Sequence, residues 1–223
     1  MDIKIPIKSI LLIGIILVFL LSCTKAKQKT KLEKVDKPIE VEEVKEIPSE
    51  KFEKDIVLMH TNYGDIKLKL FRDKAPITVE NFLTYAREKF YDGLIFHRVI
   101  STFMIQGGGF DQNYEYKTST HPPIENEATN GLSNVRGTIA MARTNQINSA
   151  TSQFFINVND NLPLDHKDMG AGFGYAVFGK VIKGMDVVDK IKNVHTKVNP
   201  KQRMKDWPKE DVIIESVEIV REG

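Results

Sequence analysis

A charged guanidinium lies among apolar residues near the middle of the chain. Arg98 belongs to the segment 96–100, which reads Phe-His-Arg-Val-Ile, and Phe103, Met104 and Gln106 follow within eight residues. Arginine keeps its positive charge, and its planar group can be held in one orientation. In a water-poor site such a group can donate a strong hydrogen bond to a substrate atom that gains electron density during a reaction.

Two further segments carry a similar mixture of residues. Residues 141–143 read Met-Ala-Arg, and residues 152–156 read Ser-Gln-Phe-Phe-Ile. Together with 96–106, these segments resemble the active-site signature of the cyclophilins, a family of peptidyl-prolyl cis/trans isomerases. The agreement is specific because the matching segments are long and lie far apart in the sequence.

The resemblance implies a role for each matched residue. Arg98 corresponds to the family's catalytic arginine, and Gln106 to the glutamine that orients it and touches substrate. Phe103 belongs to the same catalytic set, and with Met104 and Phe155 it matches the apolar floor and walls that receive a proline ring. The remaining matches are to substrate-binding positions: Leu164 to a wall, Ala142 and Arg143 to residues whose backbone pairs with the substrate chain, and Tyr175 to the rim.

The implied reaction is rotation about an X-Pro amide bond, which breaks no covalent bond. Rotation removes the amide resonance, and the prolyl nitrogen recovers its lone pair in the twisted transition state. A hydrogen bond from Arg98 to that nitrogen would stabilise the twisted form and not the planar one. No nucleophile is required, and we expect neither a cofactor nor a metal site.

Two positions depart from the animal members of the family. Pro163 stands where those proteins carry a tryptophan, and Tyr175 stands where many carry a histidine. Both features resemble the bacterial periplasmic branch. Since the indole of that tryptophan donates a hydrogen bond to cyclosporin, we expect weak cyclosporin binding, whereas isomerase activity does not depend on it.

The N-terminal segment has the pattern of a secretion signal. Lys4 and Lys8 precede an apolar run over 10–21, which is shorter than the roughly 20 residues that span a bilayer. Leu20-Leu21-Ser22-Cys23 then resembles a bacterial lipobox, in which the cysteine is lipidated. We therefore predict a lipoprotein-type signal peptide over 1–22 and a lipid anchor at Cys23, with the protein held at a membrane of the cell envelope. An ordinary signal peptide or an uncleaved anchor remains the alternative.

The next segment has a different composition. Residues 24–54 are rich in Lys and Glu, contain Pro38 and Pro48, and have few large apolar side chains. Such a segment cannot bury enough apolar surface to offset its ordering entropy. We predict a lipid-anchor cysteine and charged flexible tether over 23–54, followed by a cyclophilin-like domain over 55–223.

The domain must place the candidate residues on a scaffold of strands. Ile66, Leu68 and Leu70 alternate with polar residues, which is typical of a half-buried strand. Further short apolar runs, separated by turn residues, occupy 94–100, 103–106, 137–142, 153–158, 175–181 and 212–220. This pattern favours an antiparallel barrel. The resemblance implies a mainly β fold, an eight-stranded antiparallel closed barrel capped by two α-helices.

Several local features complete the expected domain. A first helix should follow Pro76, with Thr78 as its N-cap and its end at 92–93, and a second should cover 185–191. We interpret the glycines at 107–109 as a bend after a strand, since a phosphate-binding loop would need a nearby Lys. His97 is expected to be a core histidine tied to the backbone, and Trp207 to pack a late loop.

Composition limits the alternatives. The chain of 223 residues is 41% hydrophobic and 28% charged, with a formal net charge of +2 and one cysteine. Nothing here favours nucleic-acid binding, which needs a clustered basic excess. We expect a monomer whose partners are proline-containing polypeptides, such as unfolded or partly folded envelope proteins. A proline-peptide binding module or holdase chaperone with incidental isomerase activity stays open, as does a surface adhesin.

Overall fold

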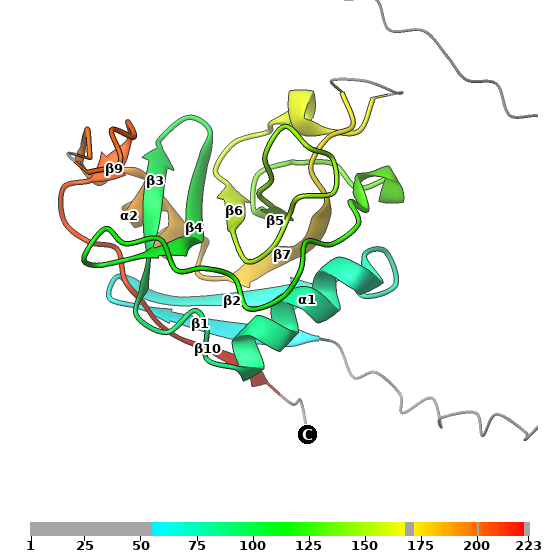
Figure 1. Ribbon diagram of the computed structural model, residues 1–223, viewed down its shortest axis with the longest axis horizontal. Helices are drawn as coiled ribbons and strands as arrows, with labels where there is room; N and C mark the ends of the chain where they lie inside the picture. Colours follow the sequence, from blue (N-terminus) through cyan, green and yellow to red (C-terminus); the bar gives the residue numbers. More distant parts are fainter. Residues whose placement is uncertain (1–54, 168–171, 200, 221–223) are drawn as a thin grey trace, which may run out of the picture. The chain divides into compact units, whose positions relative to one another are not determined.

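The computed structural model describes residues 55–167, 172–199 and 201–220 (Figure 1). The predicted signal peptide, the anchor at Cys23 and the tether lie outside these ranges. Within them, neither helix is long and apolar enough to cross a membrane.

Eight antiparallel strands form the main sheet. In chain order they are β1 (Ile56–Thr61), β2 (Gly64–Leu70), β3 (Leu94–Ile100), β4 (Met104–Asp111), β5 (Thr138–Met141), β6 (Phe154–Asn157), β7 (Val177–Lys183) and β10 (Ile214–Val220). Their order across the sheet is β10-β1-β2-β7-β5-β6-β4-β3. β8 (Thr196–Lys197) and β9 (Trp207–Pro208) pair separately. The helices are α1 (Pro76–Arg87) and α2 (Met185–Lys192), with short 3-10 turns at Ala128–Asn130 and Leu162–Leu164. The predicted mainly β fold, its eight antiparallel strands and its two helices are confirmed.

The predicted closure of the barrel is not confirmed. The sheet curls so that its edge strands β3 and β10 approach each other (Figure 1), but no ladder joins them. They meet through an isolated bridge between Ile95 and Ile213, with the amide of Gly93 donating to the carbonyl of Ile214. Farther along β3, the amide of Val99 donates to Asp206 instead. The chain before β10 therefore contacts β3 through separate hydrogen bonds, and no ladder between β3 and β10 closes the barrel.

One continuous core fills the inside of the curled sheet. It combines inward residues of the strands with the apolar faces of both helices. In α1, Phe82 is fully buried and its ring lies 5.6 Å from that of Phe154 and 5.3 Å from that of Phe178. In α2, Val188 and Ile191 are fully buried. The period-2 and helical patterns of the sequence arise from this shared core.

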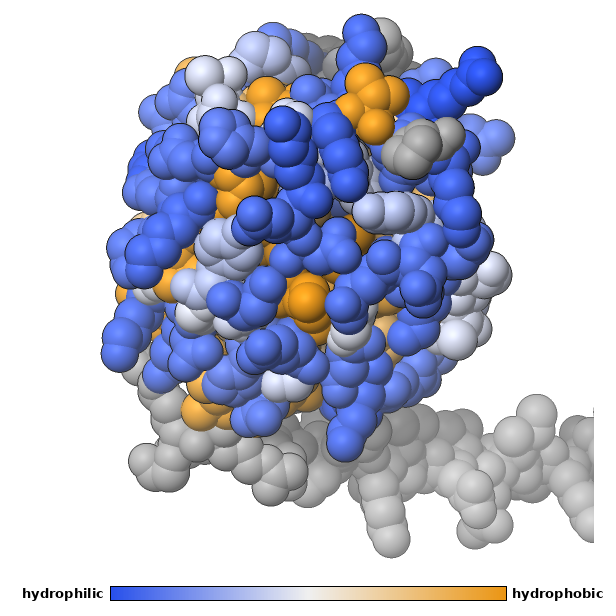
Figure 2. All heavy atoms as spheres, turned by 90° about the vertical axis from the view of Figure 1, so that its left-hand side faces the viewer, coloured by the Kyte–Doolittle hydropathy of each residue, from blue (hydrophilic) through white to orange (hydrophobic). Residues whose placement is uncertain are grey.

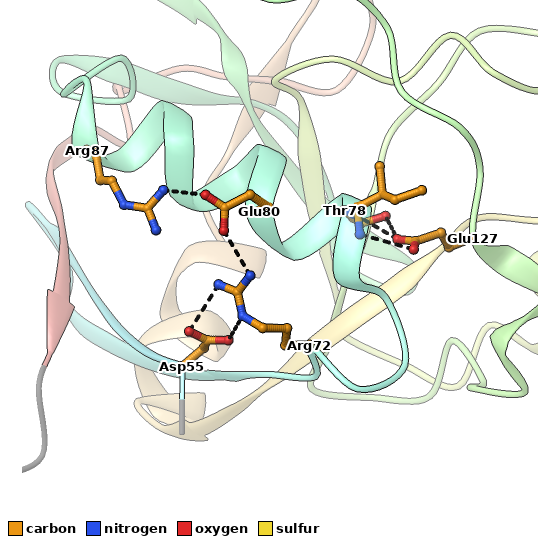
Figure 3. A network of polar contacts seen from close by, with 7 residues as sticks. Asp55, Arg72, Thr78, Glu80, Arg87 and Glu127 are labelled. Atoms are coloured by element: carbon orange, nitrogen blue, oxygen red, sulfur yellow. Dashed lines mark hydrogen bonds and ion pairs between the residues drawn. The ribbon is translucent and has the colours of Figure 1, made fainter. Parts of the chain in front are cut away.

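The start of α1 differs from the prediction. The helix begins at Pro76, and Thr78 lies in its first turn instead of at the N-cap, where Ala75 makes no side-chain hydrogen bond. Its first amides are satisfied from a distant loop (Figure 3). The Glu127 carboxylate accepts hydrogen bonds from the amides of Ile77 and Thr78, at 3.1 and 2.8 Å, and from the Thr78 hydroxyl, at 2.6 Å. A carboxylate at this position also complements the positive end of the helix dipole.

The end of α1 is earlier than predicted. The helix stops at Arg87, and the residues before Gly93 form turns. An ion-pair network joins this helix to the first described residue (Figure 3). Arg72 pairs with Asp55 at 2.6 Å and with Glu80 at 2.8 Å, and Arg87 pairs with Glu80 at 2.6 Å. The hydrogen bonds to Asp55 raise the pKa of Arg72.

The three glycines at 107–109 lie inside β4 and not in a bend after it. They form a bulge in the β3–β4 ladder, where Phe96 faces Gly107 but Leu94 faces Asp111. A Cβ atom on Gly109 would lie 2.6 Å from Cδ of Gln153. Glycine is therefore needed at 109 for the Gln153 side chain to lie against β4.

Trp207 packs the late loop, as predicted, and is fully buried. Its ring lies 5.3 Å from that of Phe110, 5.5 Å from that of Tyr114 and 5.8 Å from that of His97. On the side of the molecule that carries β3 and β9, the surface is mostly hydrophilic, with apolar residues in small separate groups (Figure 2). The Trp207 ring is thus covered from solvent beneath a mostly polar surface.

Candidate active site

A row of facing residues crosses the outer side of the sheet. Arg98 of β3 faces Gln106 of β4, which faces Phe155 of β6, which faces Ala140 of β5. Directly opposed residues in antiparallel strands point to the same side of a sheet, so these side chains share one surface. Their neighbours Ile105, Ile156 and Ile139 belong to the core on the other side. The alternation of the strands thus places the arginine, the amide and the aromatic ring together.

A cavity of about 110 Å³ lies over this row. It is smaller than the roughly 300–1,000 Å³ of a drug-sized ligand site and suits a single ring or side chain. Its lining consists of the nine residues that the sequence predicts for catalysis and substrate binding: Arg98, Phe103, Met104, Gln106, Ala142, Arg143, Phe155, Leu164 and Tyr175. The structure therefore brings all nine together, and their individual roles remain predictions.

The apolar wall is a cluster separate from the main core. Met104 and Phe155 are buried in it, and Phe103, Leu164 and Tyr175 pack against them. The rings of Phe155 and Tyr175 meet edge to face, with centroids 5.7 Å apart. The amide of Tyr175 donates to the carbonyl of Leu164 at 3.0 Å, which fixes these two residues side by side. A proline ring would find apolar contacts on several sides of this cavity.

Arg98 is half-buried at the edge of this wall. Within the described chain it forms no ion pair and no hydrogen bond through its side chain, so no carboxylate neutralises its charge there. Gln106 faces it across the ladder but donates from Nε2 to Oε1 of Gln153 at 2.9 Å. The predicted orienting contact from Gln106 to Arg98 is not among these bonds. Gln106 itself is oriented by Gln153, which rests on the glycine bulge.

Arg143 is held by neutral partners. Its Nε donates to the carbonyl of Gly174 and its Nη1 to the carbonyl of Thr144, both at 2.9 Å. Its guanidinium carbon lies 4.6 Å from the centre of the Tyr175 ring, a cation–π arrangement. The amide of the preceding Ala142 donates to the carbonyl of Gln153 at 2.9 Å and is thus already paired.

Buried asparagines join opposite sides of the cavity, and the sequence analysis missed them. Asn161 donates from Nδ2 to the carbonyl of Phe103 and to Oδ1 of Asn157, both at 2.7 Å. Asn157 donates to Oγ1 of Thr138 at 2.9 Å and to Oδ1 of Asn134 at 3.3 Å. Asn134 in turn donates to the carboxylate of Asp165 and to the carbonyl of Tyr175. This asparagine network links the Phe103 turn to the wall at 164–175.

His97 directly precedes the candidate catalytic Arg98, but its surroundings do not suit a catalytic role. It is fully buried, and neither ring nitrogen is in hydrogen-bonding geometry with a partner in the described ranges. Burial lowers the pKa of His97 to about 3, although the nearby Ile95 backbone favours the charged form and Arg98 opposes it. The ring is therefore a neutral core element at physiological pH, without the hydrogen bond to the backbone that the sequence analysis expects.

The family of the chain follows from comparison with known proteins. Residues 56–219 match the model of the family described as cyclophilin type peptidyl-prolyl cis-trans isomerase/CLD. This match covers both helices, every residue that lines the cavity and all of the main-sheet strands except the last residue of β10, Val220. The chain belongs to this family.

Individual relatives agree on the activity. Peptidyl-prolyl cis-trans isomerase B of Escherichia coli (strain K12) is 58% identical over 165 residues, covering 74% of this chain and 99% of the relative. A peptidyl-prolyl cis-trans isomerase of Acinetobacter baylyi is 57% identical, covering 74% of this chain and 85% of the relative. The chain is accordingly a peptidyl-prolyl cis-trans isomerase of the cyclophilin family.

A solved structure shows the same fold at lower identity. It is a Cryptosporidium parvum cyclophilin type peptidyl-prolyl cis-trans isomerase, determined in the presence of the dipeptide Ala-Pro. It is 28% identical, has a TM-score of 0.64, and the alignment covers 75% of this chain and 99% of that one. The 55–220 region thus corresponds to a whole cyclophilin domain.

Proposed function

We propose that this isomerase acts by an electrostatic mechanism in which Arg98 donates a hydrogen bond to the prolyl nitrogen of an X-Pro bond whose ring is seated against the apolar wall of the cavity. The observation that supports this most is the environment of Arg98: a half-buried guanidinium, without an ion-pair partner in the described chain, lining a ring-sized cavity with one apolar wall. A cation in that position keeps its hydrogen-bonding capacity for substrate.

The required stabilisation is within the reach of one such contact. The barrier to amide rotation is about 18–20 kcal/mol, and uncatalysed X-Pro exchange takes tens of seconds to minutes. An enzyme that turns over about ten times per second exceeds this by two to three powers of ten, which corresponds to ~3–4 kcal/mol. A preorganised donor in a water-poor site contributes ~3–4 kcal/mol. The apolar wall has the further task of holding the ring while the preceding carbonyl rotates.

The test is isomerisation of a short Ala-Pro peptide by the domain and its Arg98→Ala variant. Loss of a ~3 kcal/mol contact lowers kcat/KM by roughly a hundredfold. Arg87→Ala is the matched control, because Arg87 is an arginine on the surface of α1 that does not line the cavity. Unchanged activity in a folded Arg98→Ala variant would refute the mechanism. Absence of activity in the folded wild-type domain would instead favour the proline-peptide binding module or holdase.

We further propose that the substrates are proline-containing segments of unfolded or partly folded envelope proteins. The support is the sequence pattern at the N-terminus, which resembles a lipoprotein signal peptide ending at Cys23 and is followed by a Lys- and Glu-rich segment before the domain. Secreted chains fold slowly wherever an X-Pro bond must isomerise. A membrane tether would keep the catalyst where those chains emerge.

The lipid anchor is tested by Cys23→Ser in the full-length chain. The variant should leave the membrane fraction or stay unprocessed, because the serine hydroxyl does not replace the thiol in lipid transfer. The readouts are the mature mass and the distribution between membrane and soluble fractions. Unchanged values for both would rule out the anchor while leaving the isomerase activity of the domain untouched.

A further inference from the structure

Two guanidiniums and no carboxylate line the cavity. Of its nine lining residues, Arg98 and Arg143 are cationic and none is acidic. Neither arginine has an ion-pair partner within 4.0 Å in the described chain, whereas Arg72, Arg87 and Arg136 all do. The cavity therefore carries positive charge that the surrounding described residues do not neutralise directly.

Arg98 has a role in the proposed mechanism, but the mechanism does not use Arg143. The guanidinium of Arg143 is fixed by two carbonyls and by the face of the Tyr175 ring, all of which leave its charge in place. In the described chain these bonds use its Nε donor and one Nη1 donor, out of five N–H groups. The remaining N–H donors can form a bidentate pair of hydrogen bonds to the two oxygens of a carboxylate.

Two acidic side chains close to this region in the structure, Glu125 and Asp165, do not fill this position. Glu125 lines a small cavity on another side of Arg143, but it is exposed and forms no ion pair with Arg143. Asp165 follows the wall residue Leu164, and its Oδ1 accepts hydrogen bonds from the amide and the side chain of Asn134. An acceptor for Arg143 must therefore come from outside this part of the chain.

We infer that Arg143 is a specificity-determining residue that favours substrates with a carboxylate side chain on a residue adjacent to the proline. The inference rests on the isomerase pocket proposed above. While the ring occupies the apolar wall, a glutamate or aspartate beside it would come within reach of Arg143, which lines the same cavity. A partly buried site screens the attraction less than bulk water does, and salt weakens it.

The experiment compares matched peptides by NMR exchange spectroscopy at low ionic strength. One pair carries Glu or Gln before the proline and a second pair carries Glu or Gln after it, in otherwise neutral sequences. For at least one pair, kcat/KM should be about threefold to tenfold higher with Glu, the range between an exposed ion pair and a charge-assisted hydrogen bond. The preference should shrink in 0.5 M salt, where the screening length is only about 4 Å.

The assignment to Arg143 is tested by Arg143→Gln. Its Glu-to-Gln ratio of kcat/KM should fall to less than half of the wild-type ratio, whatever happens to overall activity, because a merely structural role would affect both peptides alike. Lys180→Gln is the control for net charge, since Lys180 is exposed on β7 and does not line the cavity. It should keep the wild-type ratio.

Two results overturn the inference. One is a ratio near one for both wild-type pairs, and the other is a preference that Arg143→Gln leaves unchanged. Both are distinct from failure of the proposed function, which would show as no acceleration of any of the four peptides by folded wild-type protein.

Discussion

Replacing Asn157 with alanine tests whether the asparagine network supports the cavity. The Asn157 amide makes three hydrogen bonds in a fully buried position: it accepts from Asn161 and donates to Thr138 and Asn134. Each such bond contributes about 1 kcal/mol net, and buried partners left unpaired cost more. We expect Asn157→Ala to lower the free energy of unfolding by ~3–4 kcal/mol.

The same substitution has an expected effect on substrate binding. Asn161 loses one of its two side-chain acceptors and holds the carbonyl of Phe103 less firmly. Because Phe103 lines the cavity, KM for a proline peptide should rise severalfold while kcat changes less, the pattern of lost ground-state binding. Urea unfolding measures the stability, and peptide isomerisation measures both kinetic constants.

The matched control is Asn193→Ala. Asn193 is an exposed asparagine at the end of α2 whose side chain donates to the carbonyl of Asp189. Its loss should change stability by less than about 0.5 kcal/mol. For a domain of this size, the Asn157 variant should melt about 6–16 °C below wild type. Equal melting temperatures for the two variants, or an unchanged KM in Asn157→Ala, would refute this account of the network.

Two further substitutions probe the scaffold. Glu127→Ala removes the acceptor of three hydrogen bonds at the start of α1 and should cost ~2 kcal/mol in urea unfolding, against almost nothing for the exposed Glu125→Ala; similar losses would mean that the cap is dispensable. Because burial lowers the pKa of His97 from 6.5 to about 3, the unfolded chain binds a proton that the folded chain does not between these values. Stability should therefore fall by up to about 1.4 kcal/mol per unit as pH drops from 6.5 towards 3. His97→Phe should flatten this dependence and the exposed His195→Phe should not; identical pH profiles would contradict the role of burial.

Much of the fold can be predicted from the sequence because the residues that show strand or helix periodicity are the ones that the core buries. The alternation of Ile66, Leu68 and Leu70 indicates a strand with one buried face, and all three are buried in the structure. The spacing of Val79, Phe82 and Leu83 indicates one apolar helix face, and that face enters the core. These signals are readable because each lies within a few residues of chain.

The missed features depend on partners that are distant in sequence. Glu127 caps a helix that begins 51 residues earlier, and nothing in its own neighbourhood indicates this role. Asn157 and Asn161 resemble ordinary residues at the end of a strand and in a turn until the fold places Asn134 beside them. Gln153 could have been noted, since it lies within a matched segment, but its contact with Gln106 requires the bulge at 107–109.

The nine cavity residues are recognisable from the family resemblance and not from periodicity. Patterns alone indicate that Phe155 belongs to a strand, but they do not distinguish its outward ring from the inward ring of Phe154, because both are apolar and buried. A strand covered on both sides loses the alternation that would assign its faces. The family signature supplies that assignment, and the register of the sheet explains why the matched residues meet.

The pairing of β1 with β10 has a consequence for how the domain can be connected. Ile56 faces Val220 in the ladder, so the first and last strands begin and end next to each other. Domains with adjacent ends tolerate circular permutation and insertion into loops of other proteins. A short linker could join the end of β10 to the start of β1 without altering the β3–β4–β6–β5 row that carries the cavity. The whole domain is therefore suited to insertion into a loop of another protein with its cavity intact.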